Sequence, residues 1–283
     1  MKQRFKVGEF GFQIDYPESM SIPKDFQKFT DADAFVEYEY EILIVEELPA
    51  YGGELLTERE DFLALLKEER EVRYLGTKSQ QGFYACYVEI DDHHAEISVL
   101  KDSVQDCTYN VVFTSLLALE KRLLDHQSMV LHTSYIEYMG GAILFSAPSE
   151  TGKTTQSKLW EQYRGAKTIN GDRALLSKKE GIWYAQGWPV CGTSKVCENI
   201  ALPVQAIVML GQAKENFAHR LTAMKAFSSV YSQITINRWD TEAHEKAMNL
   251  IEQLISEVPV WHLDCNISQE AVECLERKLY IER

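Results

Sequence analysis

Residues 147–154 have the types and the spacing of a phosphate-binding loop. They read Ala-Pro-Ser-Glu-Thr-Gly-Lys-Thr and fit the pattern G-x-x-x-x-G-K-[ST] at Gly152, Lys153 and Thr154, with Ala147 in the place of the first glycine. Such a loop binds phosphate because backbone N–H groups, a lysine and a helix N-terminus converge on the negative charge. We therefore predict that Lys153 contacts the β- and γ-phosphates and that Thr154 ligates Mg²⁺.

The loop's backbone N–H groups are predicted to form the phosphate cradle. The residues expected to bind nucleotide are Ser149, Glu150, Thr151, Gly152, Lys153, Thr154 and Thr155. A carboxylate beside a triphosphate is repulsive, so we expect the side chain of Glu150 to point outward, or towards a metal or the substrate.

Asp172 and His132 are the other residues with a candidate chemical role. Asp172 follows Gly171 at the end of a predicted strand, where a carboxylate could contact Mg²⁺ or act as a general base; the alternative is an ordinary turn residue. His132 lies on the strand that precedes the loop's own strand, and its alternative is a packed core histidine. The pair His93-His94 is better explained as a hairpin tip than as a metal site.

The elements around these residues predict an α/β core. A short strand over residues 142–145 enters the loop and a helix over 153–163 leaves it. Strands then alternate with helices from residue 129 onward, which is typical of an α/β domain. The predicted strands cover 129–138, 168–170, 174–176, 182–186, 204–210 and 258–263, the predicted helices 222–232, 241–257 and 268–280, with an irregular loop over 187–195.

The first part of the chain predicts a separate α+β domain of unknown role. Its expected elements are a hairpin over 4–15, strands over 35–47, 82–90, 95–100 and 109–113, and helices over 57–71 and 115–126. We place the domains at residues 1–110 and 111–283, although no linker of Pro, Gly or Ser residues marks the boundary.

Composition narrows the class of function. A formal charge of −14 over 283 residues leaves no Lys/Arg excess for a nucleic-acid partner. The sequence has no apolar run long enough to span a membrane and no apolar N-terminal segment of a secretory signal, so we expect a cytoplasmic protein. Its six cysteines are scattered, which favours reduced thiols.

Four segments together resemble the catalytic domain of HPr kinase/phosphorylase. They are Val130-Leu131-His132-Thr133, Gly141 to Phe145, Ser149 to Thr154, and Asn170-Gly171-Asp172, within a match over roughly residues 125–210. More closely, the chain is similar to HPr-kinase-like, phosphoenolpyruvate-carboxykinase-like proteins often found beside peptide-modification genes. Those share the Ser-Ala-Pro-Ser-x-x-Gly-Lys-Thr loop, the Gly-Asp-Arg motif and a later Gly-x-Pro-x-x-Gly loop, here residues 187–192.

The resemblance implies binding of ATP and Mg²⁺ by a P-loop domain of the HPr kinase and phosphoenolpyruvate carboxykinase type. It implies that Asp172 is the second residue of an aspartate pair, as metal ligand or base, with His132 near it. The loop around Pro189 and Gly192 would close over substrate, with Arg173 or Lys195 offering positive charge; a purely structural role for Pro189 and Gly192 is equally open.

The sequence departs from this family at three positions. Gly171 replaces the first aspartate, Glu150 replaces the usual glycine of the loop, and Ala147 replaces the loop's first glycine. The later family signature for phosphorolysis is absent from the sequence.

We therefore predict an ATP- and Mg²⁺-dependent kinase that acts on a hydroxyl of a small molecule or of a peptide Ser/Thr. The alternative is a nucleotide-binding regulatory or scaffold protein with little or no catalysis, with a link to peptide modification. Decarboxylating chemistry like that of phosphoenolpyruvate carboxykinase is a third reading, disfavoured by the length of the chain. A homo-oligomer is compatible with the sequence. The sequence does not indicate which molecule accepts the phosphoryl group.

Overall fold

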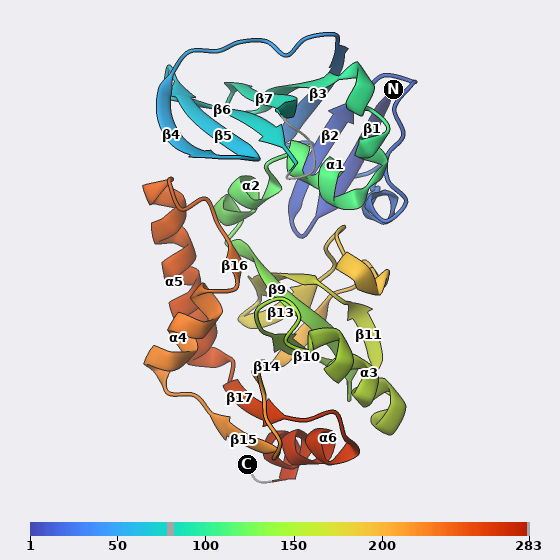
Figure 1. Ribbon diagram of the computed structural model, residues 1–283, viewed down its shortest axis with the longest axis vertical. Helices are drawn as coiled ribbons and strands as arrows, with labels where there is room; N and C mark the ends of the chain where they lie inside the picture. The colour runs from blue at the N-terminus through green and yellow to red at the C-terminus, as the bar shows by residue number, and fades with distance from the viewer. Residues whose placement is uncertain (78–81, 282–283) are drawn as a thin grey trace. The chain divides into compact units, whose positions relative to one another are not determined.

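The computed structural model describes residues 1–77 and 82–281 of the protein (Figure 1). Its contacts divide the chain into a first unit, Met1–Arg122 with Arg238–Asp240, and a second unit, Leu123–Asn237 with Thr241–Arg283. Each unit is built on a large β-sheet, so the protein belongs to the mixed α/β class. The division falls after residue 122, whereas the sequence placed it after residue 110.

The first unit contains a sheet of eight strands within the described residues, in the order β1-β2-β3-β8-β7-β6-β5-β4. The strands are β1 (Lys2–Val7), β2 (Phe10–Asp15), β3 (Tyr38–Val45), β4 (Glu54–Arg59), β5 (Phe62–Lys67), β6 (Arg70–Gly76), β7 (Phe83–Asp91) and β8 (His94–Leu100). The helical segments are η1 (Phe26–Phe29), η2 (Lys101–Ser103), η3 (Asp106–Thr108), α1 (Asn110–Leu116) and α2 (Leu119–Asp125). The predicted hairpin over 4–15 is confirmed as β1 and β2, which pair antiparallel around Gly8.

The helix predicted over residues 57–71 is wrong, because this stretch forms β4 and β5. Its leucines and phenylalanine fit a helical stripe, but β5 pairs antiparallel with both β4 and β6. Ala64 is fully buried, while Leu63 and Leu65 pack on the opposite face of the sheet. Glu68 and Glu69 then take φ values of 50° and 65°, which turn the chain back into β6 and cannot belong to a helix.

The strand predicted over residues 109–113 is also wrong, because α1 occupies this stretch. The helix predicted over 115–126 is interrupted, since α1 ends at Leu116 and α2 begins at Leu119. Ala118 separates them with a φ of 48°, a left-handed conformation that breaks a right-handed helix.

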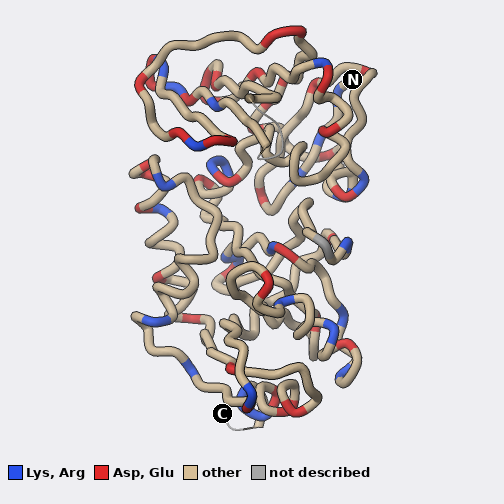
Figure 2. Tube along the Cα trace, in the orientation of Figure 1, with Lys and Arg blue, Asp and Glu red and all other residues tan. Residues whose placement is uncertain are grey.

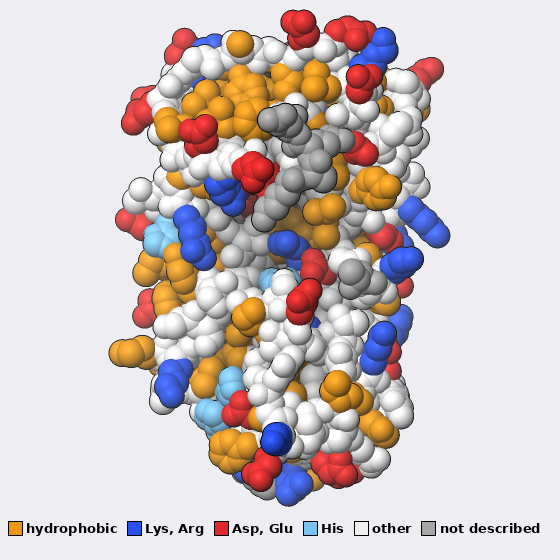
Figure 3. Space-filling model, viewed as in Figure 1, with side chains coloured by type: hydrophobic (Ala, Val, Ile, Leu, Met, Phe, Trp, Pro, Cys, Tyr) orange, Lys and Arg blue, Asp and Glu red, His pale blue; other side chains and the backbone are white. Residues whose placement is uncertain are grey.

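Apolar side chains gather over β4 to β7 on the face shown in Figure 3. The residues that pack together there are Leu48, Tyr51, Leu63, Leu65, Val72, Tyr74, Phe83, Cys86 and Val88. Tyr74 ties the segment before β4 to this face, because its hydroxyl donates to the carbonyl of Pro49 at 2.9 Å and accepts from the N–H of Tyr51 at 2.8 Å.

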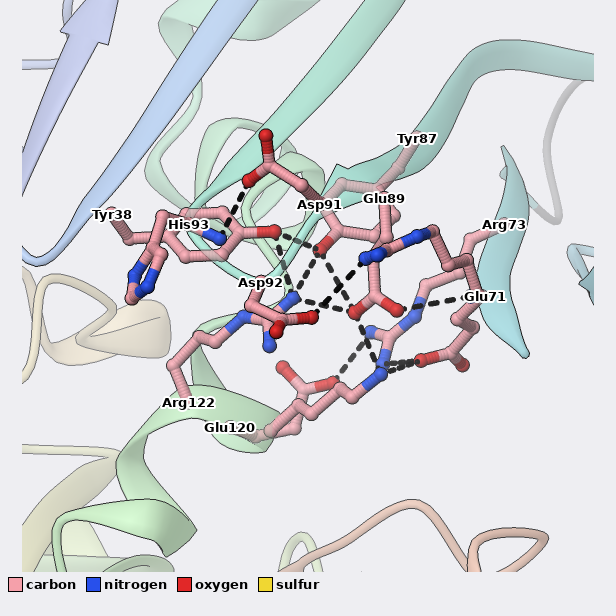
Figure 4. A network of polar contacts seen from close by, with 12 residues as sticks. Tyr38, Glu71, Arg73, Tyr87, Glu89, Asp91, Asp92, His93, Glu120 and Arg122 are labelled. Carbon is pink, nitrogen blue, oxygen red and sulfur yellow. Dashed lines mark hydrogen bonds and ion pairs between the residues drawn. The ribbon is translucent and has the colours of Figure 1, made fainter. Parts of the chain in front are cut away.

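A network of buried charges joins β6 and β7 to α2 (Figure 4). The Arg73 guanidinium is 3% exposed and donates to Glu71 at 3.1 Å and to Glu120 at 2.6 Å. Arg122 donates to Glu89 at 2.5 Å. Each charge faces an opposite charge and a hydrogen-bond partner, which is the condition for keeping ions inside a protein.

Trp239 completes this network from far along the chain. Its indole N–H donates to Glu71 at 3.1 Å, and its ring packs at 5.2 Å from that of Phe62. This contact accounts for the assignment of residues 238–240 to the first unit.

The second unit is built on a sheet of nine strands within the described residues. The strands are β9 (Ser128–Tyr138), β10 (Gly141–Ser146), β11 (Lys167–Asn170), β12 (Arg173–Lys179), β13 (Ile182–Gln186), β14 (Leu202–Gln212), β15 (Phe217–Arg220), β16 (Ile234–Thr235) and β17 (Val260–Cys265). The helical segments are α3 (Lys153–Arg164), η4 (Gly192–Ser194), α4 (Ala223–Tyr231), α5 (Thr241–Glu257), α6 (Gln269–Glu276) and η5 (Arg277–Ile281). β15 and β16 were not predicted, because both are short and carry no run of apolar residues.

The second sheet lies between helices on its two faces (Figure 1). Leu159 and Trp160 of α3 and Leu275 of α6 pack in one core cluster, whereas helices α4 and α5 pack in another. β14 pairs parallel with both β10 and β17, so these three strands end at the same edge of the sheet. The edge to which parallel strands point is where α/β proteins bind ligands.

Acidic and basic residues are scattered along the trace of both units, and acidic residues are the more numerous (Figure 2). None of the six cysteines, all of which lie in the described residues, forms a disulfide. Among the described helices, none combines the length and the apolar character that crossing a bilayer requires.

Glu71→Gln is expected to lower the free energy of unfolding at pH 7 by about 3–5 kcal/mol, because Arg73 would lose a buried partner. Burial raises the pKa of Glu71, but the charges of Arg73 and Lys121 outweigh it and lower the pKa from 4.5 to about 2. Ionised Glu71 therefore stabilises the fold above about pH 4.5, and this stabilisation is lost as the pH falls towards 2.

Urea unfolding of both proteins between pH 6 and pH 2 measures the effect. The wild type should lose stability over this range more steeply than Glu71→Gln, and the exposed control Glu58→Gln should behave as the wild type. Equal pH slopes for wild type and Glu71→Gln would contradict the assignment.

Candidate functional site

The predicted phosphate loop lies between β10 and α3, at the carboxyl edge of the sheet. β10 ends at Ser146 and α3 begins at Lys153, so the loop backbone leads directly into a helix N-terminus. Gly152 precedes the helix with a φ of 116°, which a glycine adopts without steric cost. The strand, loop and helix thus follow in the order that phosphate binding requires.

Lys153 is folded back into its own loop. Its Nζ donates to the carbonyl oxygen of Ala147 at 2.9 Å and to that of Pro148 at 3.3 Å, and the residue is 8% exposed. Burial lowers the pKa of Lys153; the charge of Asp172 raises it in part, and Arg173 lowers it again. The ammonium is held in place by backbone carbonyls rather than by a buried carboxylate.

A cavity of about 390 Å³ opens above the loop. It is lined by His132, Ser149, Glu150, Gly152, Lys153, Thr154, Thr155, Gly171, Asp172 and Gly192. This volume lies in the range of small-molecule sites. The structure thus brings together the three residues predicted to be catalytic, while Thr151, Arg173, Pro189 and Lys195 are not part of the lining.

Asp172 lies between two basic side chains. Its Oδ1 is 3.4 Å from Nε2 of His132, and its Oδ2 accepts from Nε of Arg173 at 3.2 Å. Burial raises the pKa of this carboxyl, but the hydrogen bond with His132 and the charge of Arg173 outweigh the effect and hold the pKa below its ordinary value. Asp172 is therefore ionised at neutral pH.

Arg173 does not line the cavity, but it contacts Asp172, which does. Besides its contact with Asp172, its Nη1 donates to Oγ1 of Thr235 at 2.7 Å. The guanidinium is thus fixed by two oxygens and in turn orients the Asp172 carboxylate. Lys195 is exposed and lies just after η4, with a φ of 58°.

The side chain of Asn170 holds the turn that carries Asp172. Its Oδ1 accepts from the backbone N–H groups of Asp172 at 2.8 Å and Arg173 at 3.0 Å. Its Nδ2 donates to the carbonyls of Trp188 at 2.9 Å and Val190 at 3.1 Å. One fully buried amide therefore fixes both the turn and the 187–191 loop beside it.

The loop after Val190 packs closely on this turn. A Cβ added at Gly171 would lie 2.1 Å from Oγ of Ser194, and a Cβ added at Gly192 would lie 3.1 Å from Oδ1 of Asp172. The first distance is far below any real contact, so a side chain at residue 171 would require Ser194 and its loop to move. The space that an aspartate side chain would need at this position is filled by Ser194.

Thr154 and Asp172 suit the hard cation predicted here. Both line the cavity, and they offer a hydroxyl and an ionised carboxylate oxygen. Oxygen ligands of this kind, few in number and completed by substrate phosphates, are what Mg²⁺ prefers. The donor set therefore fits Mg²⁺.

Comparison with known proteins gives the family. The fold defines a mixed α/β protein, and the family model described as SynChlorMet cassette protein ScmC matches residues 97–280. The chain belongs to this family. None of the curated proteins compared with the chain matches it. Among solved structures, it is similar to the Hpr(Ser) kinase/phosphatase from Coxiella burnetii, with 10% identity and a TM-score of 0.35, over 54% of this chain and 97% of that one.

The sequence alone did not single out Asn170, Ser194 or Thr235. The pair Asn170-Gly171 is typical of a turn. An asparagine at the end of the short strand Thr168-Ile169 could therefore have indicated a side-chain amide that holds this turn. Ser194 and Thr235 give no such signal, because each is close to the site only through the tertiary fold.

Glu150→Gly is expected to bind ATP more tightly than the wild type. Glu150 has a φ of 64°, a left-handed conformation that costs a non-glycine residue about 1–2 kcal/mol, and its negative charge lies at the predicted phosphate site. Calorimetric titration and thermal unfolding should show higher affinity and higher stability.

Two further variants separate the causes. Glu150→Gln removes only the charge and should improve affinity without the gain in stability. Glu180→Gly relieves a similar conformation, φ 51°, in the turn before β13 and should stabilise the fold without changing ATP affinity. Unchanged affinity in both Glu150 variants would contradict a repulsive role for this carboxylate.

Asn170→Ala is expected to lower the free energy of unfolding by at least about 3 kcal/mol, because four backbone groups lose their partner, two of them in fully buried hydrogen bonds. Urea unfolding measures this, with Asn266→Ala as a control, because the Asn266 amide donates to the carbonyl of Lys214 at 2.8 Å in a less buried place. If Asn170→Ala lowers the free energy of unfolding no more than the control does, the 170–173 turn does not depend on the Asn170 side chain.

Proposed function

We propose that this protein is an ATP- and Mg²⁺-dependent phosphotransferase whose acceptor is a hydroxyl group of a small molecule or of a peptide Ser/Thr. One observation carries the proposal: Lys153 and Thr154 at a helix N-terminus line the same cavity as the ionised Asp172 and His132. Phosphoryl transfer depends mainly on such positioned charges.

Each residue has a distinct part in the reaction. Lys153 and the N–H groups of the loop offset the negative charge of the β- and γ-phosphates. Thr154 and Asp172 would hold Mg²⁺, which would supply further positive charge to the phosphates when bound. Asp172 orients the acceptor hydroxyl and takes its proton as the oxygen bonds to the γ-phosphorus. The bond from that phosphorus to the β,γ-bridging oxygen breaks, and ADP leaves.

His132 and Arg173 keep Asp172 in its charged form. Their contacts of 3.4 Å and 3.2 Å lie on its two different oxygens, so the carboxylate is held from both sides. A base with a lowered pKa is a weak proton acceptor, and its main contribution is therefore to place the hydroxyl in line with the phosphorus.

A nucleotide-binding regulator with little catalysis is the second candidate. It is favoured by the filled space beside Gly171, which leaves Asp172 without the partner carboxylate of the family pattern, and by Glu150 in the loop. Such a protein would bind ATP and transfer phosphate to nothing. A role beside peptide modification would suit either candidate.

Incubation with γ-labelled ATP, Mg²⁺ and a fractionated lysate tests the proposal. Label should enter either a small metabolite or a polypeptide, and Asp172→Ala should reduce its transfer by about 10²-fold or more while largely keeping ATP binding. Lys153→Ala should lose ATP affinity, and Asp102→Ala in the first unit should match the wild type. Full transfer by Asp172→Ala would overturn the assigned role, and ATP binding without any transfer would favour the regulator.

A further inference from the structure

A second cavity, of about 520 Å³, lies beside β15, β17 and α4 in the second unit. The strands contribute His219, His262 and Asp264 to its lining, and α4 contributes Met224 and Lys225. Its volume is in the range of small-molecule sites. The proposed phosphoryl transfer uses none of the residues that line it.

The histidines and the carboxylate are arranged by the pairing of two strands. His219 lies directly opposite His262 in the β15–β17 register, and the two rings are 5.5 Å apart. Asp264 lies two residues further along β17, on the same face, and its Oδ1 is 3.2 Å from Nε2 of His262. Within residues 1–77 and 82–281, no group of three or more His, Cys, Asp or Glu side chains is placed to hold a metal ion, so a metal is not the ligand that this arrangement indicates.

The end of β14 connects this cavity to the phosphate loop. Gly211 packs on the cavity wall, since a Cβ there would lie 2.5 Å from Oδ1 of Asp264 and 3.0 Å from Nε2 of His262. The next residue, Gln212, reaches the loop with long hydrogen bonds from its amide to the carbonyls of Glu150 at 3.5 Å and Thr151 at 3.4 Å. Gly211 is thus paired with Asp264, which lines the second cavity, and Gln212 bonds to Glu150, which lines the first.

We propose that the second cavity holds the nucleoside part of the nucleotide whose phosphates lie on the 147–154 loop. This inference rests on the proposed function. Asp264, oriented by His262, accepts hydrogen bonds from the ribose hydroxyls, as carboxylates commonly do in nucleotide sites. The imidazoles of His219 and His262, tilted by 45° to each other, and the exposed Met224 offer the base aromatic and apolar contacts.

Comparing ATP with inorganic tripolyphosphate separates the two cavities, because tripolyphosphate has no nucleoside. In calorimetric titrations with Mg²⁺, Asp264→Asn and His262→Ala should weaken ATP binding at least tenfold and leave tripolyphosphate binding unchanged. Lys153→Ala should weaken both. Gly211→Ala, which crowds Asp264, should behave like Asp264→Asn, and His94→Ala in the first unit should match the wild type; thermal unfolding checks that each variant is folded.

The outcomes test the nucleoside site separately from the proposed phosphotransferase function. If Asp264→Asn and His262→Ala bind ATP as the wild type does, the nucleoside site is refuted, while tripolyphosphate binding that depends on Lys153 still supports the phosphate loop. Equal loss of ATP and tripolyphosphate in these variants would also refute it. If the wild type binds neither ligand, both proposals fall.

Discussion

The amide of Asn170 is the interaction on which the candidate site depends. It holds the N–H groups of the 170–173 turn and the carbonyls of the 187–191 loop at once, so the carboxylate of Asp172 and the loop that covers its flank cannot move separately. The phosphate loop needs no such support, because β10 and α3 fix its two ends. One half of the site is therefore set by secondary structure and the other half by a single buried side chain.

The buried charged side chains of the two units have different kinds of partner. In the first unit, Arg73 and its acidic partners satisfy one another and leave little charge for a ligand. In the second unit, Lys153 contacts only carbonyls, and the sole carboxylate partner of His132 is Asp172 within the described residues. A net charge of −14 is thus compatible with the proposed phosphate site, because salt screens the more distant charges.

Sequence reasoning worked where chemistry depends on local order. The strand, loop and helix around Lys153 were predictable because residue types, spacing and φ preference all agree, and α5 was predicted at its observed bounds, 241–257. Sequence reasoning failed over residues 57–71. The apolar residues there have helical spacing, but β5 pairs with both β4 and β6, and this pairing makes the segment a strand. The reason for Gly171 could not be read either, because Ser194 approaches it only in the folded chain.

Trp239 has a consequence for how this protein can be divided. The first unit is discontinuous, since residues 238–240 complete it from within the second half of the sequence. A fragment that ends at residue 122 would lack the indole that donates to Glu71 and covers Phe62. The first unit therefore does not correspond to one contiguous segment of the sequence, and a recombinant protein that keeps these contacts must include residues 238–240.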